Sequence, residues 1–181
     1  MNATDLMRII REQGRPLVES LFGELRTNLG TSHYHRLSNE ELFRRGQAVY
    51  QHLEGWLTSR DAAALHRSGE ELGKKRFAEG IPLGQVILAL ILEEKHLWEF
   101  AAGKGVRADE KLRLDVAEFF ARFIYSTALG FEQSLADSQQ QSRKSIEPPR
   151  GADAGVPATK PTEEKQEMPA SRGGQVGEFG G

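Results

Sequence analysis

The sequence contains no cysteine, which excludes a disulfide scaffold, a thiolate zinc site, an iron–sulfur cluster and a cysteine nucleophile. It also lacks an apolar run of the roughly 18 residues that a membrane helix needs, and its N-terminus has no signal-peptide core. Neither sign of charge dominates, because 24 Lys and Arg residues stand against 26 Asp and Glu residues. The charge therefore gives no reason to expect a nucleic acid or an acidic membrane as partner. We expect a cytoplasmic protein.

Proline is rare in most of the chain and is concentrated near its C-terminal end. Five of the seven prolines and seven of the 19 glycines lie within residues 138–181, where large apolar side chains are few. Such a segment buries too little surface to offset the cost of ordering its backbone, about 1–2 kcal/mol per residue. We therefore predict one helical domain over residues 1–137 and a disordered tail over residues 138–181. A short docking motif within that tail is an open alternative.

The apolar residues of positions 1–137 recur at helical spacing, and no Asn-Gly or Asp-Gly hairpin turn separates them. A loop is expected from Thr31 to Leu37. The prediction is an all-α single domain of five to six helices, packed as a bundle, with no strand. Breaks between the helices are expected at Gly14, at Asn28-Leu29-Gly30, at Gly80 and at Gly103 to Gly105.

Several of the expected helices begin at residues that favour helix N-termini. Ser38 and Glu41 have the spacing of a capping box, and Asp61 and Asp109 stand directly before helical patterns. Pro82 is expected in the first turn of the helix that lies between those starting at Asp61 and Asp109. These residues predict where the helices start.

Two segments carry more apolar residues than one buried face requires. From Leu83 to Leu92 the sequence is apolar nearly all round, which predicts a central helix surrounded by others. The last helix gathers three phenylalanines, and most of this aromatic surface is expected in the core. The excess predicts contact with a second copy of the chain, as a homodimer; the alternative is a last helix sandwiched between other helices. The candidate interface residues are Phe119, Phe120 and Phe123.

One pair of residues has a spacing known from metal sites. Glu93 and His96 form a Glu-x-x-His pattern, as in di-iron bundles, but that chemistry needs a second copy of the motif, and the sequence has none. We interpret the pair as a salt-bridged helix end. A haem or a metal ion bound at His96 or nearby is the alternative.

The remaining charged residues fit solvated helix faces, and they include the basic run Lys74-Lys75-Arg76. No phosphate-binding glycine loop and no nucleophile elbow is found. We therefore predict no enzyme activity, no catalytic or metal-binding residue and no cofactor. The carboxylates assigned to helix surfaces are Asp61, Glu70, Glu71, Glu93 and Glu94.

Gly69 and Gly73 lie four residues apart within a predicted helix. A glycine in that position costs about 1 kcal/mol relative to alanine. Two explanations are open: another helix approaches closely at this point, or the helix is locally loose.

The segment from Glu70 to Trp98 resembles a known family. A Leu-Gly pair, an Arg three residues later, a Gly-x-Pro-Leu sequence and an apolar helix ending in Leu97-Trp98 are similar to the N-terminal domain of RsbRD-type proteins, co-antagonists of the RsbT kinase in bacterial stress signalling. The similarity covers roughly residues 15–137. The motif residues, to which we assign a structural role, are Leu72, Gly73, Arg76, Gly80, Pro82 and Leu83.

This resemblance implies an all-helical sensory or interaction module, related to a globin fold that has lost its haem. Members of the family usually carry an output domain after this one, and here the expected tail stands in its place. The resulting hypothesis is a non-enzymatic regulatory module that binds another protein in bacterial signalling or stress response. The alternative is a helical protein that binds haem or a metal.

Overall fold

The computed structural model describes residues 1–146, and nearly all of them are helical. No strand occurs in this range, so the prediction of an all-α fold is confirmed. Most of the predicted tail, residues 147–181, lies outside the described residues. The elements are α1 (Ala3–Thr27), the 3-10 helix η1 (Leu29–Arg36), α2 (Asn39–Ser59), α3 (Ala62–Ala78), α4 (Leu83–Gly103) and α5 (Glu110–Ile146).

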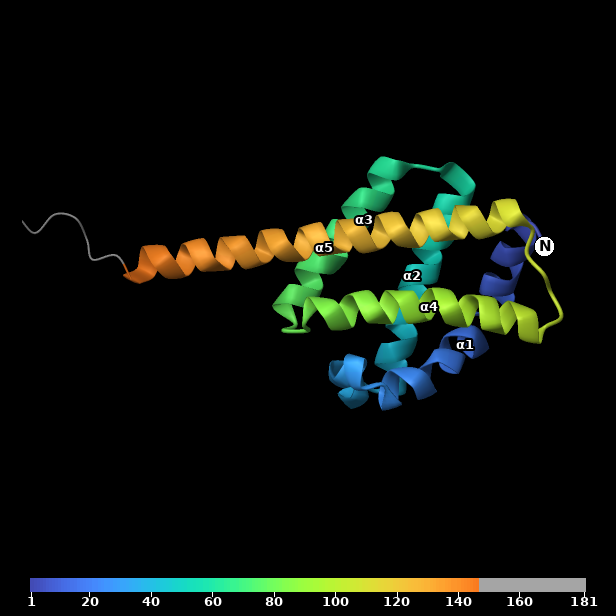
Figure 1. Ribbon diagram of the computed structural model, residues 1–181, viewed down its shortest axis with the longest axis horizontal. Helices are drawn as coiled ribbons and strands as arrows, with labels where there is room; N and C mark the ends of the chain where they lie inside the picture. The colour runs from blue at the N-terminus through green and yellow to red at the C-terminus, as the bar shows by residue number, and fades with distance from the viewer. Residues whose placement is uncertain (147–181) are drawn as a thin grey trace, which may run out of the picture. The chain divides into compact units, whose positions relative to one another are not determined.

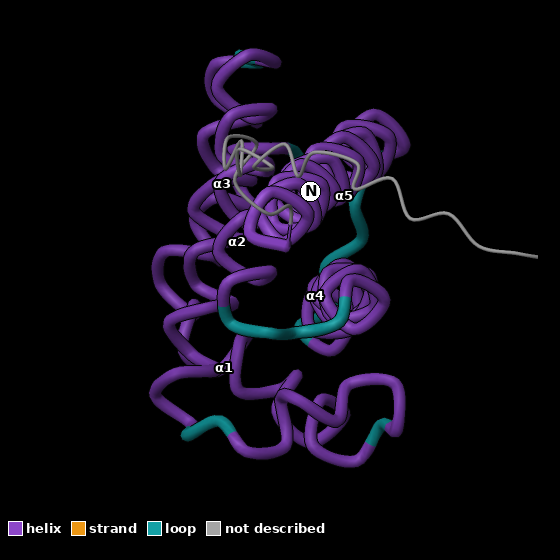
Figure 2. The backbone as a smooth tube through the Cα atoms, turned by 90° about the vertical axis from the view of Figure 1, so that its left-hand side faces the viewer, coloured by secondary structure: helices purple, strands orange, loops and turns teal. Residues whose placement is uncertain are grey.

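The helices are arranged as two crossing groups. α4 and α5 lie side by side and run in opposite directions, and α2 and α3 cross them (Figure 1). The view along α4 and α5 places η1 and the later part of α1 on the side of α4 that faces away from α5 (Figure 2), whereas α1 begins near the start of α5. α3 and α5 form the most extensive helix pair. The Trp56 indole N–H of α2 donates to the carbonyl oxygen of Asp115 in α5 (3.1 Å), which fixes this crossing.

Three of the four phenylalanines of α5, Phe119, Phe120 and Phe123, are fully buried within a single copy of the chain, with at most 1% of each exposed. The Phe119 and Phe120 rings meet edge to face, with centroids 5.0 Å apart, and the Phe119 and Phe123 rings stack at 5.3 Å. The prediction that Phe119, Phe120 and Phe123 form a dimer interface is therefore wrong. α5 is packed by α2, α3 and α4 along its first half, and these helices cover the aromatic face.

α4 is less central than its composition predicts. α1 and η1 cover one side of it, α5 covers another, and α3 contacts it as well. No described helix covers the remaining side, where Ile91 is 48% exposed. No helix within residues 1–146 is both long enough and apolar enough to cross a membrane.

The predicted helix starts are confirmed by their capping hydrogen bonds. The backbone N–H groups of Glu41, Ala64 and Leu112 donate to the side chains of Ser38 (3.1 Å), Asp61 (2.9 Å) and Asp109 (2.8 Å), respectively. Pro82 stands at the N-cap of α4 rather than inside its first turn.

Three local predictions need correction. The expected loop from Thr31 to Leu37 is mostly the 3-10 helix η1, and α1 continues past Gly14 with a kink at Gln13. α5 extends to Ile146, so residues 138–146 are helical and not part of a tail. The reason is that adding residues to an existing helix avoids the cost of nucleation, and the Gln, Arg and Lys residues of this segment are good helix formers.

Candidate functional site

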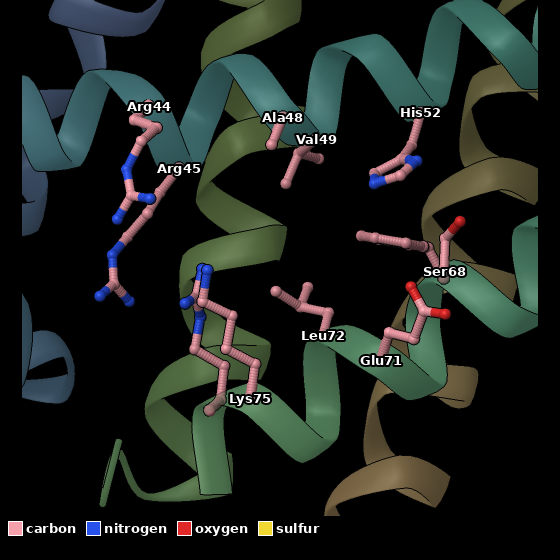
Figure 3. A pocket seen from close by; sticks show the side chains of 11 residues that line it. Arg44, Arg45, Ala48, Val49, His52, Ser68, Glu71, Leu72 and Lys75 are labelled. Atoms are coloured by element: carbon pink, nitrogen blue, oxygen red, sulfur yellow. The ribbon is translucent and has the colours of Figure 1, made fainter. Parts of the chain in front are cut away.

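A cavity of about 260 Å³ opens between α2 and α3 (Figure 3). One face of each helix lines it, because the lining residues recur at helical spacing along both chain segments. Phe123 of α5 completes the wall. The lining residues are Arg44, Arg45, Ala48, Val49 and His52 of α2 and Ser68, Glu71, Leu72, Lys75 and Arg76 of α3.

The cavity has two chemically different ends. Figure 3 shows Arg44, Arg45 and Lys75 at one end and His52, Ser68 and Glu71 at the other. The middle is apolar and is formed by Ala48, Val49 and Leu72.

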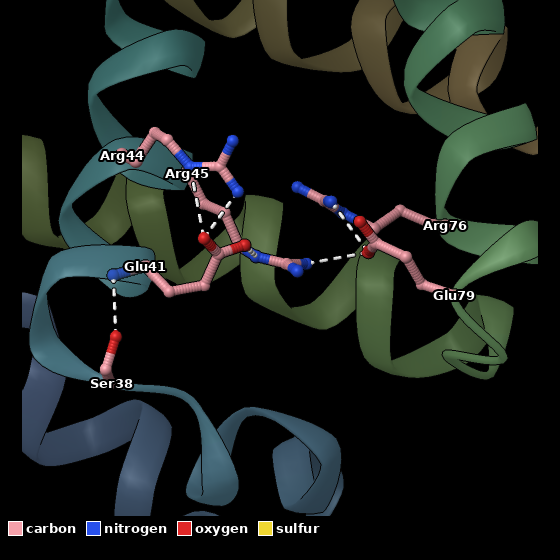
Figure 4. A network of polar contacts seen from close by, with 6 residues as sticks. All are labelled: Ser38, Glu41, Arg44, Arg45, Arg76 and Glu79. Carbon is pink, nitrogen blue, oxygen red and sulfur yellow. Dashed lines mark hydrogen bonds and ion pairs between the residues drawn. The ribbon is translucent and has the colours of Figure 1, made fainter.

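A chain of ion pairs holds the arginines of the basic end in place (Figure 4). Arg44 and Arg45 both donate to Glu41, with 2.7 Å between Arg45 Nε and Glu41 Oε1. Arg45 and Arg76 also donate to one oxygen of Glu79, each at 2.9 Å. Because Arg45 and Arg76 are mostly buried, these shared carboxylates fix both guanidinium groups at the cavity wall.

The basic end carries an excess of positive charge. Three arginines share only two carboxylates, Glu41 and Glu79. Lys75 adds a further cation, and it forms no ion pair with any described residue. Four positive and two negative side chains leave a local surplus of two positive charges. This end of the cavity therefore attracts anions.

Glu93 lies at a second, smaller cavity that shares part of its wall with the first. This cavity measures about 20 Å³, enough for one water molecule, and both cavities are lined by Arg45, Leu72 and Arg76. Glu93 is 6% exposed, and its Oε2 atom has no hydrogen-bond partner among the described residues. Burial raises the pKa of Glu93 to about 8, although the positive charge of Arg76 opposes the shift.

The assignment of Glu93 and Arg76 to solvated helix faces is therefore wrong. Glu93 stands three residues after Leu90 and four before Leu97, on the face of α4 that is buried against the other helices. That spacing is the sequence signal that would have identified Glu93 as a buried residue. Arg76 is buried because α3 turns this position toward α2, while Lys74 and Lys75 are exposed as predicted.

His96 is engaged by carboxylates. Its Nε2 atom lies 2.7 Å from Glu24 Oε2, and its Nδ1 atom lies 3.6 Å from Glu99 Oε2. Lys95 donates to the same Glu24 oxygen (2.8 Å), and the hydrogen bonds from Lys95 and His96 lower the pKa of Glu24. This arrangement ties α4 to α1. Within residues 1–146 no group of three or more potential metal ligands is found, and His96 lines neither of the two cavities described above.

The family-motif residues separate into two groups in the structure. Leu72 and Arg76 line both cavities. The others build the helix packing and the α3–α4 connection: Gly73 packs against α5, Gly80 adopts a left-handed conformation (φ 69°), Pro82 is the N-cap of α4 and Leu83 is its first residue.

The α2–α3 cavity brings His52, Ser68 and Glu71 together at one end. No hydrogen bond within the described structure joins Ser68 to His52 or His52 to Glu71, as an activated nucleophile would require. No protein-family model, no curated protein and no solved structure matches this chain.

Proposed function

We propose that this chain is a non-enzymatic, cytoplasmic regulatory module that acts through protein–protein interaction and pairs with a second copy through α5. The resemblance to RsbRD-type N-terminal domains supports the regulatory part. The pairing is inferred from an exposed apolar stripe on α5. This stripe, and not the buried phenylalanines, is the proposed interface.

The stripe repeats every seven residues along α5. Leu114, Ala121, Ala128 and Leu135 hold equivalent positions of this repeat, and Tyr125 lies on the same side of the helix. Leu114, Tyr125 and Leu135 are 64%, 63% and 42% exposed. At 100° per residue these three side chains fall within a sector of about 80°.

A seven-residue apolar repeat is the pattern by which two helices pack along each other. From the first to the last leucine the stripe is about 31 Å long at 1.5 Å per residue. α5 also continues beyond α3 at its C-terminal end (Figure 1), so a second copy has access to this part of the stripe. A twofold arrangement is favoured because the same stripe serves both copies.

The test is the mass of the full chain by light scattering at about 50 µM. We expect a dimer for the wild type, a folded monomer for Leu135→Asp, and a dimer for the control Gln133→Asp, which places the same charge about 80° away from the edge of the stripe. Far-UV circular dichroism establishes that each variant is folded. A monomeric wild type, or a dimeric Leu135→Asp variant, contradicts the proposal.

A further inference from the structure

We propose that the cavity between α2 and α3 binds a small organic acid with an apolar body and a hydroxyl group at its far end. The carboxylate of this ligand lies among the cations of the basic end, and the apolar body of the ligand lies along Val49 and Leu72. Its hydroxyl reaches His52 and Ser68. This site is separate from the α5 stripe, so the two proposals fail independently.

The basic end supplies both charge and preorganisation for the carboxylate. Arg45 and Arg76 are held by Glu41 and Glu79, so little conformational freedom is lost when an anion arrives. A guanidinium group has five N–H donors, and each of these two groups keeps donors beyond those used in its ion pairs. Lys75 is exposed at the rim and free of ion pairs with described residues, so it is the cation able to close on the ligand.

The size and the wall of the cavity restrict the body of the ligand. A volume of about 260 Å³ lies just below the ~300–1,000 Å³ of typical small-molecule sites, which favours a compact ligand over a long lipid chain. Val49 and Leu72 face each other across the middle (Figure 3), and Phe123 forms part of the wall. Inorganic phosphate has no apolar part that could pack against this surface.

The far end offers hydrogen bonds to a neutral polar group. His52 packs against the Phe123 ring, with 5.4 Å between the ring centroids, and partial burial lowers its pKa, which favours the neutral imidazole. A neutral imidazole has one donor and one acceptor nitrogen, and the Ser68 hydroxyl has both functions. Glu71 at this end disfavours a second carboxylate on the ligand and accepts a hydrogen bond from a hydroxyl.

The test is calorimetric titration of the full chain with a panel of monocarboxylic acids of roughly six to ten carbons, led by 3-(4-hydroxyphenyl)propionate. We expect at least one acid to bind with Kd below about 1 mM, and its primary alcohol and inorganic phosphate to bind at least roughly tenfold more weakly. Absence of binding across the panel overturns the proposal, and so does phosphate binding as tight as that of the best acid.

Matched variants locate the site. Lys75→Ala weakens binding roughly three- to fivefold, whereas Lys74→Ala, which removes a neighbouring exposed lysine outside the cavity, leaves Kd unchanged. Ala48→Trp fills the cavity from its exposed edge and abolishes binding while the melting temperature is retained. Equal effects of the two lysine variants, or full binding by a folded Ala48→Trp variant, overturn the assignment to this cavity.

Discussion

Gly73 in α3 lies directly against the backbone of Thr127 in α5: a Cβ atom added to Gly73 would fall 2.0 Å from the Thr127 carbonyl oxygen. Gly130 of α5 is equally close to α3, since its Cβ would lie 2.1 Å from the carbonyl oxygen of Glu70. A Cβ at Gly69 would lie 2.5 Å from the Cβ of Ser126. Close approach of another helix is therefore the correct explanation for Gly69 and Gly73.

Alanine at position 73 should be strongly destabilising. Backbone atoms cannot yield as a flexible side chain can, so we expect Gly73→Ala to lower the free energy of unfolding by about 3 kcal/mol or more. Gly23→Ala is the matched control, because a Cβ there meets nothing within 4 Å. It should raise stability by about 0.5–1 kcal/mol through better helix propensity. Urea denaturation measures both changes, and similar values for the two variants would contradict the close packing.

Stability should depend on pH through Glu93. Its pKa of about 8 in the folded chain lies above the ordinary value of 4.5. Between these two values the folded chain binds one more proton than the unfolded chain, so the free energy of unfolding falls as pH rises. The stabilisation is complete below about pH 4.5 and is lost as pH rises through about 8.

Glu93→Gln should remove this contribution. The variant gains stability relative to the wild type as pH rises from about 5 to 8, by on the order of a few kcal/mol. Urea denaturation of both proteins across this range isolates Glu93, because all other titrating groups are shared. Parallel pH profiles would show that Glu93 is not the buried acid described here.

Phe120 and Tyr125 of α5 should respond very differently to truncation. Phe120 is buried in the core, so Phe120→Ala should cost about 3–5 kcal/mol, and Phe120→Asp should unfold the chain rather than release a monomer. Tyr125 is exposed, and Tyr125→Ala should change the stability of a single copy by about 0.5 kcal/mol or less. Thermal and urea denaturation at low protein concentration compare the two. A folded, stable Phe120→Asp variant would place this residue outside the core.

Glu24 and His96 should be energetically coupled. Their 2.7 Å contact joins α1 to α4, so we expect His96→Ala to lower the stability of the chain. A double-mutant cycle with Glu24→Gln measures the coupling directly, and we expect about 1 kcal/mol near pH 7. Additive effects of the two substitutions would show that the contact contributes nothing.

The sequence alone was sufficient for the features that depend on neighbouring residues. Ser38, Asp61 and Asp109 cap helices because a short polar side chain reaches backbone N–H groups three residues further along. The apolar spacing between these caps is enough to establish an all-α fold. Composition was a poorer guide to where α5 ends, because a helix that has already formed continues through residues that would not start one.

The candidate site depended on tertiary structure. Arg45, Arg76 and Glu93 come from three different helices, and nothing in the local pattern of any one helix shows that they meet at a common wall. The same holds for Phe120, whose spacing allowed either a core or an interface position. Local patterns determine which side chains share a helix face, but packing between distant segments determines what covers that face, and so decides which charges are buried and which apolar side chains stay exposed.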